Sequence, residues 1–295
     1  MNANARGSIG FSASNSGMFP SLHLAEILTL LLIPLALVAS LGGLFIPNLY
    51  REPAVMQPAM RGQDLVTVLA LVVISLALLA VRRGSARATL VWLGLLGYVF
   101  YTYTGAAFGY AFNNFFLIYV ALFSVSMFTL VSAVSSLKIF DLKNRFDPAT
   151  PRVSVVIALG VFAFLLTALW LAQIIPFLTS GTLPEIIKRS GGVTSFVFVL
   201  DLGLVLPLAV LSALWLWWQQ PWGYVLAGYI LIKAATMGLA LLVMNWFSLR
   251  AGMPVDPLEL MAFYALLAVG GLVMAVWFLW YRHDANTASN LELQH

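Results

Sequence analysis

Long uninterrupted apolar segments constrain this chain more than any other feature of its sequence. Eight of them are long enough to cross a hydrocarbon core of ~30 Å, which takes about 20 helical residues. They lie near residues 24–47, 64–82, 88–110, 114–137, 153–178, 193–218, 221–247 and 258–281. Backbone polar groups inside lipid must be satisfied within their own segment, which a helix achieves. The sequence therefore predicts an all-α fold, a polytopic transmembrane bundle of about eight helices.

The composition agrees with lipid as the main solvent and excludes several kinds of site. Of the 295 residues, 62% are hydrophobic and 9% are charged, against roughly 25% charged in a soluble domain. There is no cysteine and there are three histidines, all near the ends, so thiolate metal sites are excluded and histidine-bound metal or haem is not expected. We expect no cofactor, no metal and no catalytic motif. The net charge of +4 lies mostly in the loops, which fits lipid headgroups better than nucleic acid.

The positions of the basic residues predict the orientation. Arg82, Arg83 and Arg87 fill the link between the second and third segments, and the link at 138–152 is basic as well. The positive-inside rule then places both links, and with them both termini, in the cytoplasm. In general manner only, the chain resembles multi-pass proteins of bacterial inner membranes, and this is the location we expect.

The ends of the chain are predicted to be tails. Residues 1–22 are rich in Ser, Asn and Gly, which is typical of a flexible segment, and residues 283–295 form a polar C-terminal tail. A signal peptide cleaved at Val38-Ala39-Ser40 is an alternative for the first segment. The apolar stretch continues beyond that point to Ile46, which favours a retained helix.

The two halves of the chain share a pattern that indicates an internal duplication. Ser75 follows Asp64 by eleven residues in the second segment, and Ser212 follows Asp201 by eleven in the sixth. Further pairs follow in order, namely Gly97-Tyr98 with Gly228-Tyr229 and Asn114-Phe115-Phe116 with Asn245-Trp246-Phe247. We predict a first four-helix repeat at 23–137, a basic linker at 138–152 and a second repeat at 153–282, in parallel orientation. Composition bias is the alternative, because apolar segments align easily by accident.

Asp201 is the most informative single residue. It lies about nine residues into the sixth segment, roughly 12 Å deep at 1.5 Å per residue. A carboxylate in a membrane costs on the order of 2.5–3.5 kcal/mol, so it should have a partner. Eleven residues make about three helical turns, which places Ser212 on the same face. Binding of a cation, a proton or an amine is the functional interpretation, and a structural hydrogen-bond acceptor is the alternative.

Asp64 is the related acid in the second segment, predicted to lie less deep than Asp201. Its functional interpretation is the same, and the structural alternative is that it caps the start of its helix. Lys233 stands near the middle of the seventh segment, where we expect a buried ion pair with Asp201. A direct part in proton or substrate handling is the alternative.

Three further groups of polar or small residues are candidates for packing or for binding. The third segment is rich in Tyr and Thr, including Tyr101 and Thr102, and continues into Gly105 and Gly109. The glycine spacing is typical of close helix packing, with a binding cleft as the alternative. The asparagines at the outer ends of the third and seventh segments are predicted to cap those helices or to line the rim of an outward cavity.

These observations favour a transporter or permease for a small solute or ion, with Asp201 as the coupling carboxylate and Lys233 as its charge partner. The candidate binding residues are Asp201, Lys233, Asp64, Asn114, Asn245, Ser212 and Thr102. One alternative is a non-catalytic membrane subunit, assembly factor or sensor that packs against a protein partner or a second copy. A lipid-modifying enzyme is the third interpretation, since the basic residues predicted to face the cytoplasm could hold headgroups.

Overall fold

The computed structural model describes residues 23–280, and the regular structure in this range is helical. Eight helices are long and apolar enough to cross a membrane. They are α1 (His23–Phe45), α2 (Gln57–Arg82), α3 (Ala86–Gly109), α4 (Phe116–Ser135), α6 (Arg152–Ser180), the sixth span (Phe196–Trp217), α10 (Pro221–Arg250) and the eighth span (Leu258–Trp280). The predicted all-α bundle of eight long helices is confirmed.

Two of the eight spans are interrupted helices. The sixth span consists of α8 (Phe196–Leu200), a π-helical turn η1 (Asp201–Val205) and α9 (Leu206–Trp217). The eighth span consists of α11 (Leu258–Ala265), a second π-helical turn η2 (Leu266–Gly270) and α12 (Gly271–Trp280). Two short helices, α5 (Ile139–Asn144) and α7 (Glu185–Ser190), lie in the connections.

The predicted bounds agree with the helices to within a few residues, except at the start of α2. That helix begins at Gln57, with Pro58 in its first turn, where the missing proline N–H leaves no bond unmade. Asp64 is therefore inside the helix, and the prediction that it caps the start is wrong. The predicted tails at 1–22 and 283–295 lie outside the described residues.

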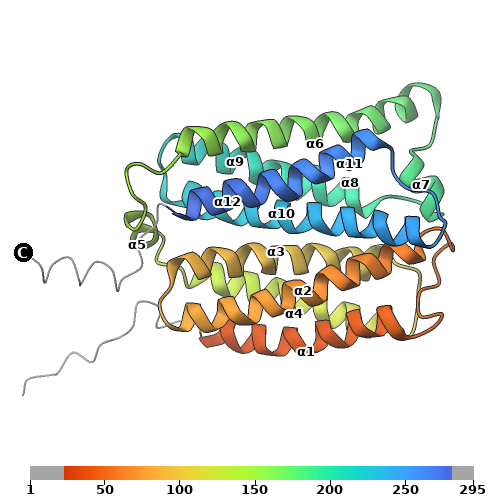
Figure 1. Ribbon diagram of the computed structural model, residues 1–295, viewed down its shortest axis with the longest axis horizontal. Helices are drawn as coiled ribbons and strands as arrows, with labels where there is room; N and C mark the ends of the chain where they lie inside the picture. The colour runs from red at the N-terminus through yellow and green to blue at the C-terminus, as the bar shows by residue number, and fades with distance from the viewer. Residues whose placement is uncertain (1–22, 281–295) are drawn as a thin grey trace, which may run out of the picture.

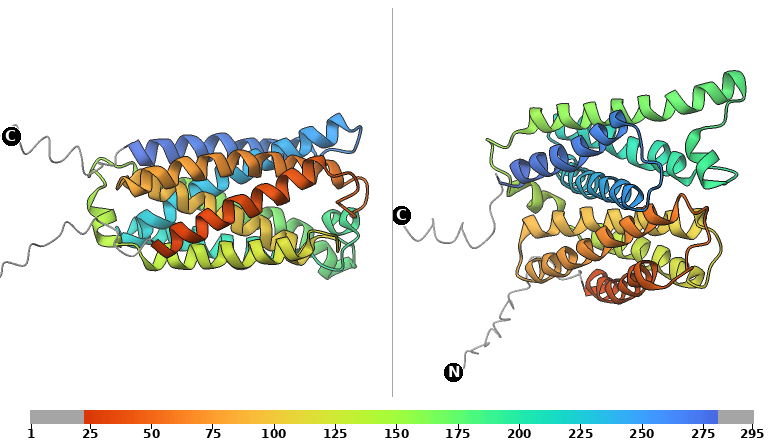
Figure 2. Two further views of the ribbon diagram at one scale, coloured as in Figure 1. Left: turned by 90° about the horizontal axis from the view of Figure 1, so that it is seen from below. Right: turned by 45° about the vertical axis from the view of Figure 1, so that its right-hand side comes forward.

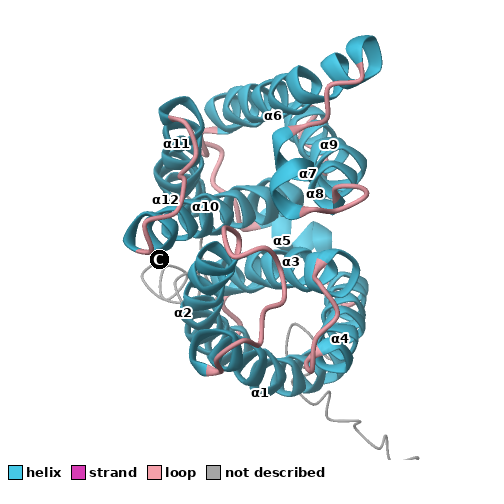
Figure 3. Ribbon diagram, turned by 90° about the vertical axis from the view of Figure 1, so that its right-hand side faces the viewer, coloured by secondary structure: helices cyan, strands magenta, loops and turns pink. Residues whose placement is uncertain are grey.

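The first four spans pack around one another in a closed ring, here called the first bundle. Each of α1 to α4 contacts the next, and α4 returns to contact α1. The view along the helices in Figure 3 shows this ring below a second group of four spans. In that second bundle α6 packs on α9, α9 packs on α10, and α10 contacts the whole eighth span, whereas α6 makes little contact with α12. The second ring therefore has an open seam between α6 and the eighth span.

The two bundles meet along α10, which packs against both α2 and α3 (Figure 1). Glycines allow the close approach. A Cβ atom at Gly62 of α2 would lie 2.7 Å from the Met244 Cα atom of α10. On α3, Gly94 faces the Ile232 side chain in the same manner. Because α3 packs against α2, α4 and α10, it is the most deeply buried span.

The connections that carry most of the basic residues lie at one end of the molecule. The α2–α3 link and the segment that contains α5 are at the same end in Figure 1, as the predicted topology requires. At the opposite end, α6 stands away from its neighbours, which is clearest in the right-hand view of Figure 2. The internal repeat stays a prediction, since π-helical turns interrupt only spans of the second bundle among the described residues.

Candidate functional site

The Asp201 carboxylate lies inside the second bundle and accepts two hydrogen bonds. Its side chain is buried, with the residue 8% exposed. The Tyr101 hydroxyl of α3 donates to Oδ1 at 2.9 Å, and the Trp170 indole Nε1 of α6 donates to Oδ2 at 2.9 Å. The prediction that Asp201 needs a polar partner is therefore confirmed. Its two hydrogen-bond donors are neutral groups from helices on either side of the sixth span.

The backbone at Asp201 is a π-helical turn, and a proline follows it closely in the sequence. A proline inside a helix clashes with the carbonyl group four residues earlier and lacks an N–H. Pro207 lies in the first turn of α9, so an unbroken α-helix would bring its ring against the Gly203 carbonyl. The wider turn avoids this contact, and the Leu206 N–H bonds to the Asp201 carbonyl oxygen instead. The residue that the predicted repeat pairs with Pro207 is Ala70, and α2 is a continuous α-helix there.

The start of the sixth span changes the predicted depth of Asp201. The helix begins at Phe196, so Asp201 lies roughly 7.5 Å along it at 1.5 Å per residue. Asp64 lies roughly 10 Å along α2 by the same measure. Measured from the start of its helix, Asp201 therefore lies no deeper than Asp64, and its greater depth in the membrane stays a prediction.

Lys233 lies at the centre of α10 and is 5% exposed. Its Nζ atom is 4.0 Å from the centroid of the Tyr101 ring, which is cation–π geometry. Within residues 23–280 no ion pair joins Lys233 to Asp201, so the prediction of a direct buried pair is wrong. Tyr101 contacts both groups instead, the base through its ring and the acid through its hydroxyl.

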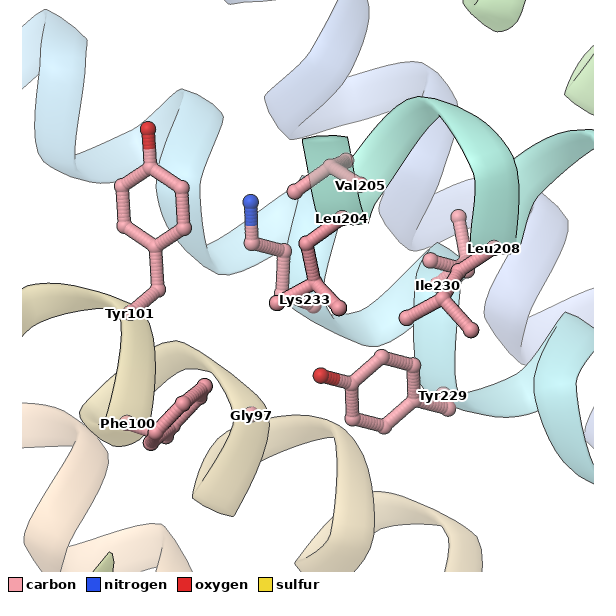
Figure 4. A pocket seen from close by; sticks show the side chains of 9 residues that line it. All are labelled: Gly97, Phe100, Tyr101, Leu204, Val205, Leu208, Tyr229, Ile230 and Lys233. Carbon is pink, nitrogen blue, oxygen red and sulfur yellow. The ribbon is translucent and has the colours of Figure 1, made fainter. Parts of the chain in front are cut away.

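A cavity of about 10 Å³ lies beside the lysine. This is close to the smallest space that holds a water molecule. Figure 4 shows its walls, which come from α3, the sixth span and α10. They are formed by Gly97, Phe100, Tyr101, Leu204, Val205, Leu208, Tyr229, Ile230 and Lys233. The cavity thus lies where the two bundles meet, and the lysine is the charged residue in its wall.

The small residues predicted to bring helices together instead accommodate an aromatic ring. Cβ atoms placed at Gly105 and Gly109 of α3 would overlap the Phe196 side chain. Phe196 is the first residue of α8. Its ring therefore joins the sixth span to α3 near the start of that span, before Asp201.

The wider turn at Asp201 also alters the predicted relation to Ser212. The prediction that Ser212 shares a face with Asp201 assumed an unbroken α-helix over the eleven-residue interval between them, and the π-helical turn interrupts that helix. Ser212 is nevertheless fully buried, and Asp201 is buried as well.

The first bundle has its own buried acid, which is hydrogen bonded differently. The Tyr50 hydroxyl donates to Asp64 Oδ2 at 2.5 Å. Gly43 of α1 leaves the space for this pair, because a Cβ atom there would overlap both Asp64 Oδ2 and the Tyr50 oxygen. Burial, followed by the nearby Asp64 carboxylate, raises the pKa of Tyr50 well above its ordinary value. The phenol is therefore a hydrogen-bond donor throughout the neutral range.

The Thr102 side chain belongs to a polar network of the first bundle and not to the Asp201 site. Gln63 Nε2 donates to the Tyr98 hydroxyl at 2.7 Å and to Thr102 Oγ1 at 3.1 Å. Tyr98 also shares a 3.1 Å hydrogen bond with Thr67. This network joins α2 to α3.

The two asparagines that the repeat pairs with each other lie in different environments. Asn245 is buried within α10 and does not cap it. Its side-chain Nδ2 donates to Asp256 Oδ2 at 3.1 Å, and its Oδ1 accepts from the Asp256 N–H at 2.8 Å. Arg189 also contacts Asp256, with its Nη1 atom 3.4 Å from Oδ1. Asn114 is an exposed residue between α3 and α4. The structure thus brings together Asp201 and Lys233, through Tyr101, and leaves the asparagines elsewhere.

The sequence singled out the acid and the base but not the groups that join them. Tyr101 was visible within the polar stretch of the third segment, whereas Trp170 lies in an apolar segment where nothing marks it. Within residues 23–280 no cluster of three or more His, Cys, Asp or Glu side chains could hold a metal ion. Comparison of the chain with family models, curated proteins and solved structures finds no match. The assignment of function therefore depends on the site itself.

Proposed function

We propose that this multi-pass protein is a proton-coupled permease for a small solute, in which Asp201, Tyr101 and Lys233 handle the proton. The observation that carries this proposal is the arrangement of the three side chains. Asp201 and Lys233 are both buried, with exposed fractions of 8% and 5%. The phenol of Tyr101 contacts both of them. Ionisable groups inside a membrane are costly and mark proton or solute paths.

The chemistry of the three groups suits this task. A phenol hydroxyl both donates and accepts hydrogen bonds, so it can follow a proton that arrives at or leaves Asp201. The ammonium of Lys233 lies on the ring of the same tyrosine and therefore senses the charge of the acid. The cavity beside Lys233 is close to the space needed for the one water molecule that could carry a proton between these groups.

The position of the groups gives the proposed proton movement a mechanical consequence. Asp201 belongs to the sixth span and Trp170 to α6, whereas Tyr101 belongs to the first bundle. Neutralising the carboxylate weakens its hydrogen bonds to both donors, since charge-assisted bonds are the stronger ones. The contact between the bundles at this point would loosen each time Asp201 takes a proton. Movement of one bundle against the other is the usual basis of alternating access.

Purified protein in vesicles loaded with the pH indicator pyranine tests the proposal. A panel of amines, amino acids, carboxylates and sugars is added outside, and we expect at least one solute to drive proton entry. The substitution Asp201→Asn should abolish that entry, and Lys233→Met should reduce it strongly. Asp141→Asn and Lys138→Met are matched controls, because both residues are exposed in the segment between α4 and α6. Entry that survives in Asp201→Asn contradicts the proposal.

A non-catalytic packing module is the second candidate, favoured by the small size of the cavity. Many polar side chains of the first bundle are also paired with one another, as in the Gln63 network. For such a module no solute in the panel moves protons, and Asp201→Asn changes only the melting temperature Tm. The two measurements on one variant separate the candidates.

A further inference from the structure

A second hollow lies far from Asp201, at the end of the molecule that carries the basic connections. It is a groove of about 200 Å³ between the start of α6 and the end of α9. Its walls are formed by Arg152, Val153, Val156, Leu216, Trp217 and Gln219. Its volume is far above the ~10–15 Å³ that one water molecule needs, so the groove has room for a phosphodiester group. The groove takes no part in the site of the second bundle.

Arg152 gives the groove a positive charge that no acidic side chain of residues 23–280 neutralises through an ion pair. The residue is half-buried, and among the described residues its guanidinium has no hydrogen bond or ion pair recorded. By contrast, Arg82 at the same end pairs with Glu26 at 2.9 Å. A planar guanidinium offers a fork of donors that matches the oxygens of a phosphate. An anion is therefore the complementary ligand.

Gln219 supplies a second observation that does not depend on charge. Its φ angle is 54°, which places a residue with a side chain in the left-handed region where glycine is preferred. The turn between α2 and α3 uses Gly84, with φ 81°, for the same purpose. A left-handed residue directly after a helix is a common way for that helix to end, but the conformation costs a glutamine more than a glycine. The Gln219 amide side chain lines the groove and has no hydrogen bond recorded within residues 23–280, so it is free to bind a ligand.

The surroundings of the groove are apolar and face outward. Val153 and Ile157 on α6 are 58% and 60% exposed, and Leu214 and Trp217 on α9 are 42% and 61% exposed. These helices cross the membrane, so their exposed apolar side chains are in contact with acyl chains. Tryptophan is also typical of the headgroup level of a membrane. The ligand of the groove should therefore combine an anionic head with apolar chains.

We propose that this groove binds the headgroup phosphate of an anionic phospholipid, held by Arg152 and Gln219. The acyl chains lie along the exposed faces of α6 and α9. Basic pockets between membrane helices bind anionic headgroups in this manner. Most of the described basic residues lie at the same end, namely Arg82, Arg83, Arg87, Lys138, Lys143, Arg145 and Arg152, against Glu26, Asp141 and Asp147. The lipid is thus drawn to this end of the molecule before the groove selects it.

Native mass spectrometry of the full-length protein tests the assignment. The protein is released from micelles that contain equal amounts of phosphatidylglycerol and phosphatidylcholine, and the retained lipid is counted. We expect the wild type to retain phosphatidylglycerol preferentially, and Arg152→Gln to weaken that retention by roughly fivefold or more. Arg83→Gln is the matched control, since Arg83 is exposed at the same end but lies outside the groove. It should retain the lipid as the wild type does.

The substitution Gln219→Gly separates binding from folding. Glycine relieves the left-handed strain, so the variant should fold with an unchanged or higher Tm. It should nevertheless retain less phosphatidylglycerol. The proposal is overturned if Arg152→Gln or Gln219→Gly retains as much phosphatidylglycerol as the wild type. It is also overturned if Arg83→Gln loses as much phosphatidylglycerol as Arg152→Gln. Displacement of the lipid by millimolar inorganic phosphate also overturns it, because the groove would then be a site for a free anion.

Discussion

At the scale of single residues, two tyrosines border the cavity beside Lys233, and they differ in one hydrogen bond. The Tyr101 hydroxyl donates to Asp201 at 2.9 Å, whereas for the Tyr229 hydroxyl no hydrogen bond is recorded within residues 23–280. We therefore expect Tyr101→Phe to lower the free energy of unfolding by about 1.5–3 kcal/mol, the value of a hydrogen bond to a charged group. Tyr229→Phe should leave it almost unchanged.

The same two variants also test the proposed function. If the hydroxyl of Tyr101 passes the proton, solute-driven proton entry in vesicles should fall in Tyr101→Phe and persist in Tyr229→Phe. Equal entry in the two variants would show that the hydroxyl has a structural role alone. The melting temperature Tm of each variant, measured in one detergent, shows whether it has lost its fold.

In the first bundle, the space left by Gly43 can be tested by adding a side chain. Because a Cβ atom there overlaps both Asp64 Oδ2 and the Tyr50 oxygen, Gly43→Ala should force the pair apart and lower the free energy of unfolding by about 1–3 kcal/mol. Gly160→Ala is the control, since nothing lies within 4 Å of a Cβ atom at that position of α6. It should raise stability by up to ~1 kcal/mol. Thermal melting in one detergent compares the two variants, and equal shifts would contradict the assigned role of Gly43.

The cost of a charge in lipid made Asp201 and Lys233 predictable from the sequence, but it could not identify their partners. The prediction of a direct ion pair assumed that the two charged groups of neighbouring helices would meet. Tyr101 comes from α3 of the first bundle, and no local pattern in a sequence tells which helix of another bundle lies beside an acid. Trp170 was hidden for a second reason. An indole in an apolar segment is ordinary, and its N–H matters only once the fold has placed it.

At the scale of elements, the contact between α3 and α8 is the one most open to a test. The Phe196 ring lies against Gly105 and Gly109, so Gly109→Ala should destabilise the protein. In a Phe196→Ala background the same substitution should cost little, because the ring that it would meet is gone. A double-mutant cycle on thermal stability should therefore give a coupling energy of about 0.5–3 kcal/mol. Additive effects of the two substitutions would contradict the contact.

The helices themselves were predicted well, because length and hydropathy decide which segments can cross a membrane. The interruption at Asp201 was missed because one wider turn leaves the apolar pattern almost unchanged. Pro207 lies beside the turn but was not a decisive signal, because Pro34 and Pro176 lie inside continuous α-helices and η2 contains no proline. The extended start of α2 had a clearer signal in Pro58, since proline is favoured in the first turn of a helix.

At the scale of the whole molecule, the two bundles are held together by close backbone contact between α2 and α10. Gly62→Val should separate these helices, because any side chain at this position meets backbone atoms of Met244. We expect a loss of stability larger than about 3 kcal/mol, at the upper end for overpacking. Gly160→Val on α6 is the control with the same added volume in open space. Thermal melting together with size-exclusion chromatography compares them, and a similar Tm for both variants would contradict this account of the interface.

The open seam between α6 and the eighth span makes the bilayer a structural component of one half of the protein. The first bundle closes on itself through the contact of α1 with α4, whereas α6 and α12 make little contact, so acyl chains would complete the wall of the second bundle in a membrane. Lipids contact the outer faces of both bundles, but only at this seam would they lie between two spans that make few contacts with each other. We therefore expect membrane thickness and chain unsaturation to affect the second bundle more than the first. Detergent extraction, for the same reason, removes a packing partner from the half that holds the candidate site.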